Sequence, residues 1–255
     1  SPDKNTKEII VNSENFFEGK FRNIKTTYTN FRTLERKSTL KEWFFPPKDK
    51  NPLGPLPTIK FQGQDLTEGK FVWFGHSTLL MKTEGLVVMT DPVFNRASPL
   101  PSFSSKSKSS FFNGKPFVFE NPILIEDLPK VDVVIISHDH YDHLDSKAIK
   151  DLSNLVDHFI VPLGVGAHLE RWGVDKNKIT ELDWYESKSY KDVEFIFAPA
   201  LHFSGRGITN GNSTLWGSWI VKSKSLSAYF SGDGGYSETF KKLGNEYGPF
   251  DIAFI

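Results

Sequence analysis

The sequence predicts a mixed α/β domain in which two sheets pack between helices. Three observations support this fold class. From residue 71 onward the chain holds many short apolar, β-branched stretches, which are typical of strands. The first of these form a run of hairpins, and the later ones alternate with segments typical of helices. The 255 residues, of which 38% are hydrophobic and 14% aromatic, are enough to bury a core of this size.

Residues 1–60 differ from the rest of the chain. They are charged and polar, carry the aromatic pairs Phe16-Phe17 and Phe44-Phe45, and end in a proline-rich stretch. We expect an extended N-terminal arm over 1–60 that packs through its aromatic rings, followed by one domain over 61–255. The charge content leaves an alternative open, a partly disordered leader.

The elements predicted after residue 60 start with a meander and then alternate. Capping and turn residues mark their ends: Glu84-Gly85 is a turn signal, and Asp145 and Ser237 are candidate N-caps. Helices are expected from Ser146, at 166–172, and from Ser237 to about Tyr247. Strands are expected at 71–74, 78–82, 86–90, 131–136, 159–162, 194–198, 215–221, 228–230 and 251–255.

A run of nine residues after the strand at 131–136 holds three of the seven histidines and three carboxylates. His138 and His140 are two residues apart, so on an extended segment both rings can reach one ion. Asp142 repeats that step and His143 follows at once, which lets them serve a second ion. Imidazole and carboxylate suit zinc, iron and manganese. The spacing therefore predicts a two-metal hydrolase centre rather than a polar loop that only joins a strand to a helix.

Two further candidate ligands follow predicted strands. His202 comes just after the strand at 194–198, where it is well placed to join His138 and His140. Asp233 lies between glycines, which let the backbone turn tightly and approach an ion. The alternatives are a surface-loop histidine and a turn aspartate.

The motif at 138–143 fits the HxHxDH signature of the metallo-β-lactamase fold. The wider context resembles the branch that contains N-acyl-phosphatidylethanolamine phospholipase D and its bacterial relatives. The motifs that carry this narrower resemblance lie at 73–78, 90–94, 95–99, 136–145, 214–219 and 231–233. The resemblance covers about residues 71–255 and implies a four-layer αβ/βα sandwich with its site along one edge of the sheets.

The resemblance implies two divalent ions, with Zn²⁺ favoured and iron or manganese also compatible. The implied ligands are His138, His140 and His202 for the first ion and Asp142 and His143 for the second, with Asp233 shared by both. The family supplies a further histidine from a later strand, and no histidine follows His202 here. The chain also stops within an apolar run at 251–255 that predicts a buried strand. We therefore expect a domain that is incomplete at its C-terminus.

Asp142 and His76 are the candidate catalytic residues. Asp142 can orient the attacking hydroxide and carry its proton, while His76 could hydrogen-bond within the site or bind substrate. Asp91 is a candidate to accept the second N–H of a metal-bound histidine. His158 and His168 are expected to be structural.

These residues predict a hydrolase in which two ions activate a bridging water for attack on phosphorus or a carbonyl carbon. The leading hypothesis, which the resemblance implies, is a zinc-dependent phosphodiesterase that cuts a phospholipid-like diester. A second hypothesis is a soluble hydrolase of a small phosphorylated or lactone substrate, resembling the ascorbate-6-phosphate lactonase branch. A third is a non-catalytic metal-binding module.

Composition narrows the class further. The 31 basic and 31 acidic residues balance, so we expect no nucleic-acid partner. The absence of cysteine excludes disulfides, thiolate zinc sites and a thiol nucleophile. No apolar run approaches 18 residues, so we expect a soluble or peripherally membrane-associated protein of the bacterial cytoplasm or periplasm. Peripheral contact could come from the loop that carries Lys106, Lys108, Phe111, Phe112 and Lys115; the alternative is an ordinary surface loop.

Overall fold

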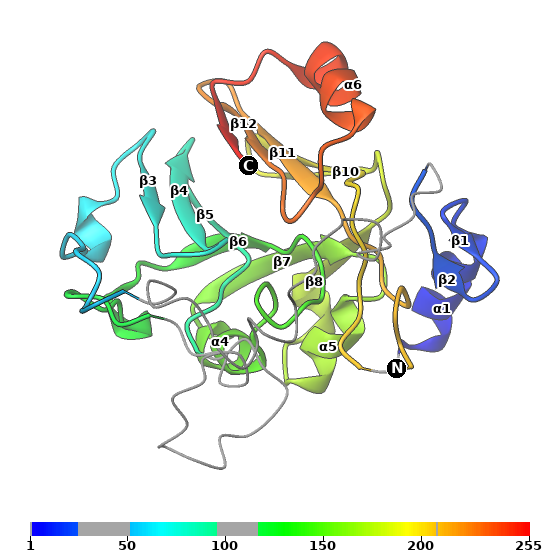
Figure 1. The fold of residues 1–255 in the computed structure, drawn as a ribbon, viewed down its shortest axis with the longest axis horizontal. Helices are drawn as coiled ribbons and strands as arrows, with labels where there is room; N and C mark the ends of the chain where they lie inside the picture. Colours follow the sequence, from blue (N-terminus) through cyan, green and yellow to red (C-terminus); the bar gives the residue numbers. More distant parts are fainter. Residues whose placement is uncertain (1, 25–51, 96–116, 208) are drawn as a thin grey trace, which may run out of the picture.

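The computed structural model describes residues 2–24, 52–95, 117–207 and 209–255. Two sheets face each other, and helices cover the outer face of each (Figure 1). This is the four-layer αβ/βα arrangement that the family resemblance implies. The lysine- and phenylalanine-bearing loop and the pair Phe44-Phe45 lie outside the described residues.

The larger sheet has six strands in sequence order. They are β3 (Phe71–Trp73), β4 (Leu79–Thr83), β5 (Leu86–Thr90), β6 (Val131–Ile135), β7 (Val156–Pro162) and β8 (Ile179–Leu182). The first three form the antiparallel meander, and from β5 onward neighbours are parallel. Parallel neighbours need crossovers: α4 (Ser146–Leu152) lies in the one from β6 to β7, and α5 (Gly166–Arg171) in the one from β7 to β8. The side chain of Asp145 caps α4 as predicted.

The smaller sheet has five strands in the order β13-β12-β11-β10-β9. They are β9 (Ser187–Tyr190), β10 (Val193–Ala198), β11 (Ser218–Lys222), β12 (Ser227–Phe230) and β13 (Ile252–Phe254). Only the β12–β13 pair is parallel, and α6 (Glu238–Tyr247) makes its crossover on the outer face. Ser237 occupies the N-cap position of α6, but its side chain does not cap the helix.

Strand β6 shows how the layers are built. Val133 and Ile135 point into the core between the sheets, whereas Val134 and Ile136 point into a second core under α4 and α5. This alternation follows from the two-residue period of a strand. Strand β10 alternates in the same way, between the shared core and a third cluster under α6. Sheets buried on both faces explain the nearly continuous apolar runs in the sequence.

The N-terminal residues form elements that the sequence does not predict. They are α1 (Lys4–Asn12), β1 (Phe16–Phe17) and β2 (Lys20–Phe21). Phe21 is fully buried in the core between the sheets, and Phe16 meets it edge-on at 4.9 Å between ring centroids. These rings pack as expected, whereas Phe17 is exposed. The division of the chain at residue 60 remains a prediction.

Besides the N-terminal elements, three further elements differ from the sequence-based expectation, and β11 starts later than predicted. Strands β8 and β9 lie at sheet edges, and neither shows an alternating apolar pattern in the sequence: β9 is mostly polar, and β8 carries its two apolar residues at its ends. A strand forms within the run at 251–255, as expected, but the expectation that this strand is buried was wrong. It forms the edge strand β13, in which Ile252 and Phe254 are half-buried while Ala253 is exposed. Within the described ranges, no helix combines the length and the apolar character needed to cross a bilayer.

Candidate metal centre

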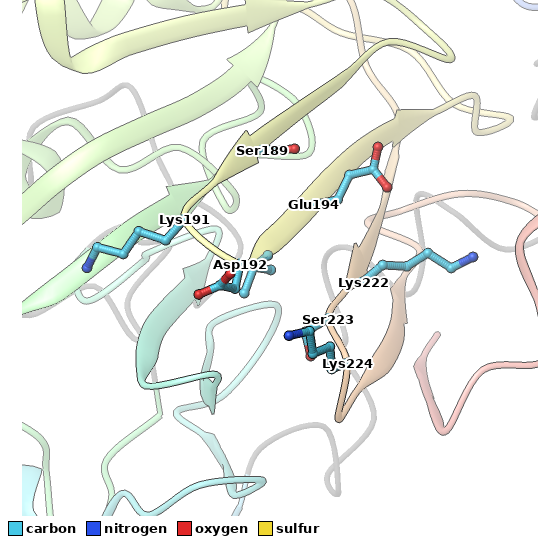
Figure 2. A pocket seen from close by; sticks show the side chains of 8 residues that line it. Ser189, Lys191, Asp192, Glu194, Lys222, Ser223 and Lys224 are labelled. Atoms are coloured by element: carbon cyan, nitrogen blue, oxygen red, sulfur yellow. The ribbon is translucent and has the colours of Figure 1, made fainter.

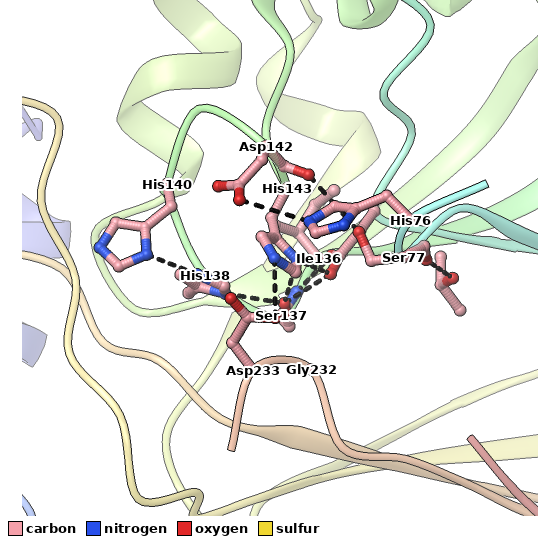
Figure 3. Close-up of polar contacts among 12 residues, drawn as sticks. His76, Ser77, Ile136, Ser137, His138, His140, Asp142, His143, Gly232 and Asp233 are labelled. Atoms are coloured by element: carbon pink, nitrogen blue, oxygen red, sulfur yellow. Dashed lines mark hydrogen bonds and ion pairs between the residues drawn. The ribbon is translucent and has the colours of Figure 1, made fainter. Parts of the chain in front are cut away.

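The predicted ligands lie close together, and Figure 3 labels all of them except His202. Loops that follow three strands bring them together. The loop after β6 carries His138, His140, Asp142 and His143, the segment after β10 carries His202, and the turn after β12 carries Asp233. His76 joins them from the connection between β3 and β4. The site therefore takes residues from both sheets.

Three imidazoles form the first group of ligand atoms. His138 Nε2 lies 2.8 Å from His140 Nδ1, and His202 Nε2 lies 3.2 Å from each of them. A tetrahedral ion held at 2.0–2.1 Å by each ring would separate such nitrogens by about 3.3 Å. The triangle in the structure thus has nearly the dimensions of a three-histidine metal site.

The electrostatics of this group favour neutral rings. Burial lowers the pKa of His138 and of His202, and the neighbouring imidazoles lower both further, so that His202 has a pKa of about 4. Burial also lowers the pKa of His140, although nearby carboxylates oppose the effect. Neutral imidazole is the form that binds a metal ion. At neutral pH each of the three rings is therefore neutral and has one nitrogen with a free lone pair.

A second group lies beside the first. His143 Nε2 is 3.0 Å from Asp233 Oδ1, and His76 Nε2 is 3.3 Å from Asp142 Oδ2. The ligand atoms of His76, Asp142 and His143 lie within 4.8 Å of one another, as do those of His138, His143 and Asp233. His143 and Asp233 therefore connect the second group to the first.

The donor set fits the ions that the fold implies. Despite its short approach to Asp233, the buried His143 Nε2 makes no hydrogen bond of good geometry. Such an orphaned nitrogen, surrounded by carboxylates and imidazoles, is placed as a metal ligand would be. Burial would lower the pKa of His143, but the carboxylates of Asp233 and Asp91 outweigh it and raise that pKa to about 10. Burial would raise the pKa of Asp142, yet His76 and His143 hold it below the usual range.

Asp91 hydrogen-bonds to a candidate metal-binding histidine, which is the contact that the sequence predicts for it. This fully buried carboxylate accepts the Nδ1 proton of His143 at 2.7 Å. It also accepts from the backbone N–H of Ser137 at 2.7 Å and from its hydroxyl at 2.5 Å. The Ser137 hydroxyl lies 2.9 Å from His138 Nδ1. One carboxylate thereby fixes a ring in each group. The backbone of Asp91 has a φ of +34°, and that of His76 has a φ of +48°. Both values lie in the left-handed region, which is costly for residues with a Cβ and is seen at functional sites.

Glycine positions Asp233. Gly232 has a φ of +55°, and a Cβ on it would lie 2.7 Å from the Cβ of Ser137. Only glycine allows the turn after β12 to come so close to the loop after β6. This is the close approach predicted from the glycines around Asp233.

Arg206 is a site residue that sequence reasoning missed. Its guanidinium donates to the carbonyls of Asp139 at 2.8 Å and Leu144 at 2.7 Å, and lies 4.0 Å from the centre of the Tyr141 ring. It therefore holds both ends of the ligand-bearing loop. No periodicity or motif marks this arginine in the sequence, because its partners are backbone groups distant along the chain.

The two histidines expected to be structural have polar partners. His158 pairs with the Thr180 hydroxyl at 2.8 Å, away from the ligand groups. His168 Nε2 lies 3.4 Å from the buried carboxylate of Asp139, whose other oxygen accepts from the backbone N–H of Gly205 at 2.6 Å. His168 thus contacts the loop that carries the ligands but belongs to neither ligand group.

A hollow of about 290 Å³ opens beside the first group. It is lined by Lys20, His140, Phe203, Ser204, Gly205, Gly207, Gly211 and Asn212. The Phe203 ring lies 4.7 Å from the rings of both His140 and His202. An apolar wall and a lysine therefore stand next to the metal-ligand rings.

A second hollow, of about 320 Å³, lies between the β9–β10 and β11–β12 turns (Figure 2). Its lysines do not converge, since Lys191 and Lys222 point away from each other. Lys191 instead pairs with Asp132 at 3.0 Å. This hollow contains no residue of either ligand group.

Comparison with known proteins agrees with the site. The profile of the beta-lactamase superfamily domain matches residues 87–255. The chain belongs to this family and has the metallo-β-lactamase fold.

Two solved structures share the fold: the diiron β-hydroxylase CmlA from Streptomyces venezuelae and an isothiocyanate hydrolase from Delia radicum gut bacteria. CmlA has a TM-score of 0.54 at 24% identity over 72% of this chain and 33% of its own. The isothiocyanate hydrolase has a TM-score of 0.51 at 20% identity, and the match covers 69% of this chain and 67% of the hydrolase.

Two curated relatives are similar over most of the chain. An uncharacterized protein of Mycobacterium tuberculosis is 41% identical over 209 residues, which is 80% of this chain and 53% of the relative. N-acyl-phosphatidylethanolamine-hydrolyzing phospholipase D 1 of Caenorhabditis elegans is 36% identical over 223 residues, which is 82% of this chain and 60% of the relative. The chain thus spans between about half and three-fifths of the length of these relatives.

Proposed function

We propose that this protein is a binuclear metal-dependent phosphodiesterase that acts on a phospholipid-like diester. The observation that carries the proposal is the pair of adjoining ligand groups, because two groups of imidazoles and carboxylates side by side suit two ions on one substrate. The similarity to an N-acyl-phosphatidylethanolamine-hydrolyzing phospholipase D supports the choice of substrate.

The geometry supports one distribution of ligands. The first ion would be held by His138, His140 and His202, and the second by Asp142 and His143, with Asp233 shared by both. Zinc is the ion we favour; the donor set also accepts iron and manganese. When bound, such ions lower the pKa of a water molecule and neutralise charge on the phosphoryl oxygens.

The remaining chemistry falls to side chains of the chain. Asp142, whose pKa lies below the usual range, is ionised at neutral pH and can accept a proton from the attacking water at Oδ2. His76 contacts that oxygen through Nε2 and is half-exposed, so it can pass the proton to solvent or to the leaving oxygen. Asp91 keeps His143 in the tautomer whose Nε2 faces the centre.

The proposal is tested by metal content and turnover together. Protein purified without added metal should contain close to two ions per chain by plasma mass spectrometry, and it should hydrolyse bis-p-nitrophenyl phosphate. His140→Ala should lose an ion and the turnover, whereas the control His158→Ala should keep both, because His158 lies outside the ligand groups. Metal uptake without turnover on any diester would indicate a binding module instead.

Substrate form separates the lipid hypothesis from its soluble alternative. The hollow beside His140 has room for a small molecule, which favours a soluble phosphorylated substrate as the second candidate. Turnover of N-acyl-phosphatidylethanolamine in vesicles should exceed that of a soluble diester with the same head group. The opposite order would support the small-substrate hydrolase.

A further inference from the structure

The segment at 2–24 reaches the metal centre through one side chain. Asn23, two residues after β2, pairs with both backbone groups of His202: its Nδ2 donates to the carbonyl at 2.9 Å, and its Oδ1 accepts the N–H at 3.3 Å. Oδ1 also accepts from the indole N–H of the buried Trp216 at 3.2 Å. The amide thus ties a candidate ligand residue to a fixed point in the core.

His202 needs such a partner because it lies outside any sheet ladder. It follows β10 by four residues, and the bridge next to it is made by the preceding residue, Leu201, with Gly235. Among the described residues, Asn23 is the only hydrogen-bond partner found for either backbone group of His202. The position of the ring in the first ligand group therefore depends on this contact.

The segment that carries Asn23 is itself anchored elsewhere. Phe21 is fully buried between the sheets, and its N–H donates to the carbonyl of Asn212 at 2.9 Å. Asn15 donates to Asp183 Oδ1 at 2.7 Å, and Ser13 donates to the other oxygen of that carboxylate at 2.5 Å. The segment can stay docked without Asn23, so the two roles can be separated by mutation.

We propose that Asn23 is a positioning residue of the metal centre, which makes the N-terminal segment part of the functional site. Asn23 lies ahead of residues 87–255, which the family profile matches. The proposal rests on the proposed function only in that the first ligand group binds a metal ion. Partners that orient metal ligands change metal affinity about 10- to 100-fold when they are removed.

The test compares Asn23→Ala with Asn15→Ala in the full chain, loaded with Co²⁺. Asn23→Ala should bind the ion about 10- to 100-fold more weakly, with an altered visible absorption spectrum, because His202 is no longer held. Asn15→Ala removes one hydrogen bond from the same segment, to Asp183, which belongs to neither ligand group, so its affinity and spectrum should match the wild type. Asn23→Asp keeps the acceptor and loses the donor, so it should fall between the wild type and Asn23→Ala.

The outcomes are distinguishable. An unchanged Co²⁺ affinity and spectrum in Asn23→Ala, or an equal loss in Asn15→Ala, overturns the proposal; if Asn23→Ala fails to fold, Asn23→Asp takes its place in this comparison. A wild-type protein that takes up no ion contradicts the proposed function instead. In that case hydrogen exchange of metal-free protein decides about Asn23: the amides of 200–204 should exchange faster in Asn23→Ala than in Asn15→Ala, and equal rates overturn the proposal.

Discussion

At the scale of single residues, the centre depends on side chains that are not themselves candidate ligands. Asp91 orients His143, Arg206 holds the ligand loop by its carbonyls, and Asn23 holds His202. The sequence identified all six ligand candidates and Asp91, because their residue types and their places after strands are visible in it. Arg206 and Asn23 could not be found in this way, since they act on the backbone of residues distant along the chain and leave no local pattern.

Asp91→Asn should weaken both folding and metal binding. The variant removes the charge that pairs with a buried imidazole, and breaking a buried pair costs about 3–5 kcal/mol. Metal affinity should fall about 10- to 100-fold, because the amide no longer fixes the His143 tautomer. Denaturant unfolding and metal titration measure the two effects. The matched control is Asp157→Asn, which breaks a surface pair with Lys130 and should change stability by less than about 1 kcal/mol. Unchanged metal affinity in Asp91→Asn would contradict the role assigned here.

Arg206→Lys should loosen the ligand loop for two reasons. Both carbonyls are bonded by Nη1, which lies one bond beyond the position that a lysine Nζ reaches, and an ammonium lacks the flat guanidinium face that lies over Tyr141. We expect a loss of about 1.5–3 kcal/mol in the free energy of unfolding, the usual contribution of hydrogen bonds to a charged group. Arg22→Lys is the control, since Arg22 makes an exposed pair with Glu18 and should change little. Equal unfolding free energies for the two variants would contradict the view that Arg206 holds the ligand loop through its carbonyls.

At the scale of elements, burial decides what the sequence can predict. The central strands of both sheets were predicted because both of their faces are apolar. Edge strands β8 and β9 and the helix α1 carry too few apolar side chains to give a periodic signal. β11 begins at Ser218 rather than at the predicted 215, because Gly217 lies so close to the end of β10 that a Cβ on it would be 2.4 Å from the carbonyl oxygen of Ala198.

Two glycine-to-alanine changes should have opposite effects. Gly217→Ala places its Cβ against backbone and against the Phe197 ring, so it should destabilise the protein by roughly 1–3 kcal/mol or more. Gly244→Ala lies within α6, where a Cβ meets nothing within 4 Å, and should stabilise it by about 0.5–1 kcal/mol. Thermal unfolding of both variants checks the prediction, and a stabilising Gly217→Ala would show that the β10–β11 approach is looser than described.

The contact between β8 and α5 should give stability a pH dependence. Burial raises the pKa of Glu181, although the N–H of Gly166, donating at 2.8 Å, opposes this. A carboxyl whose folded pKa exceeds its unfolded pKa favours folding fully below the unfolded pKa, and this contribution is lost as the pH rises through the folded value. The free energy of unfolding of Glu181→Gln, relative to that of the wild type, should therefore increase as the pH rises from 4.5 to 7.5. Urea unfolding at the two pH values would measure this change. A constant difference would mean that Glu181 titrates normally.

At the scale of the whole molecule, the ligand groups join the two sheets. The loop after β6 belongs to the larger sheet, whereas His202 and Asp233 follow strands of the smaller one. Bound ions would thus link halves that otherwise meet through their shared core and a few hydrogen bonds, such as that from Trp219 Nε1 to the carbonyl of Ile136 at 2.8 Å.

Metal removal should therefore lower the melting temperature. An ion present at 1,000 times its dissociation constant adds about 4 kcal/mol to the stability of the native state. Dialysis against a chelator should remove this increment, and added zinc should restore it. In His140→Ala the melting temperature should respond weakly to either treatment. A wild-type melting temperature that ignores chelation would contradict metal binding by the native state.

The order of these residues along the chain has a consequence for biosynthesis. Asn23 leaves the ribosome first, the four ligands of the loop after β6 follow, and His202 and then Asp233 emerge later. The three imidazoles of the first group are therefore synthesised before β11, β12 and β13, whereas the shared carboxylate of Asp233 is synthesised only after β12. Loading of the two positions would then be staggered in time, with the first ion captured on a nascent chain and the second only after the smaller sheet has closed.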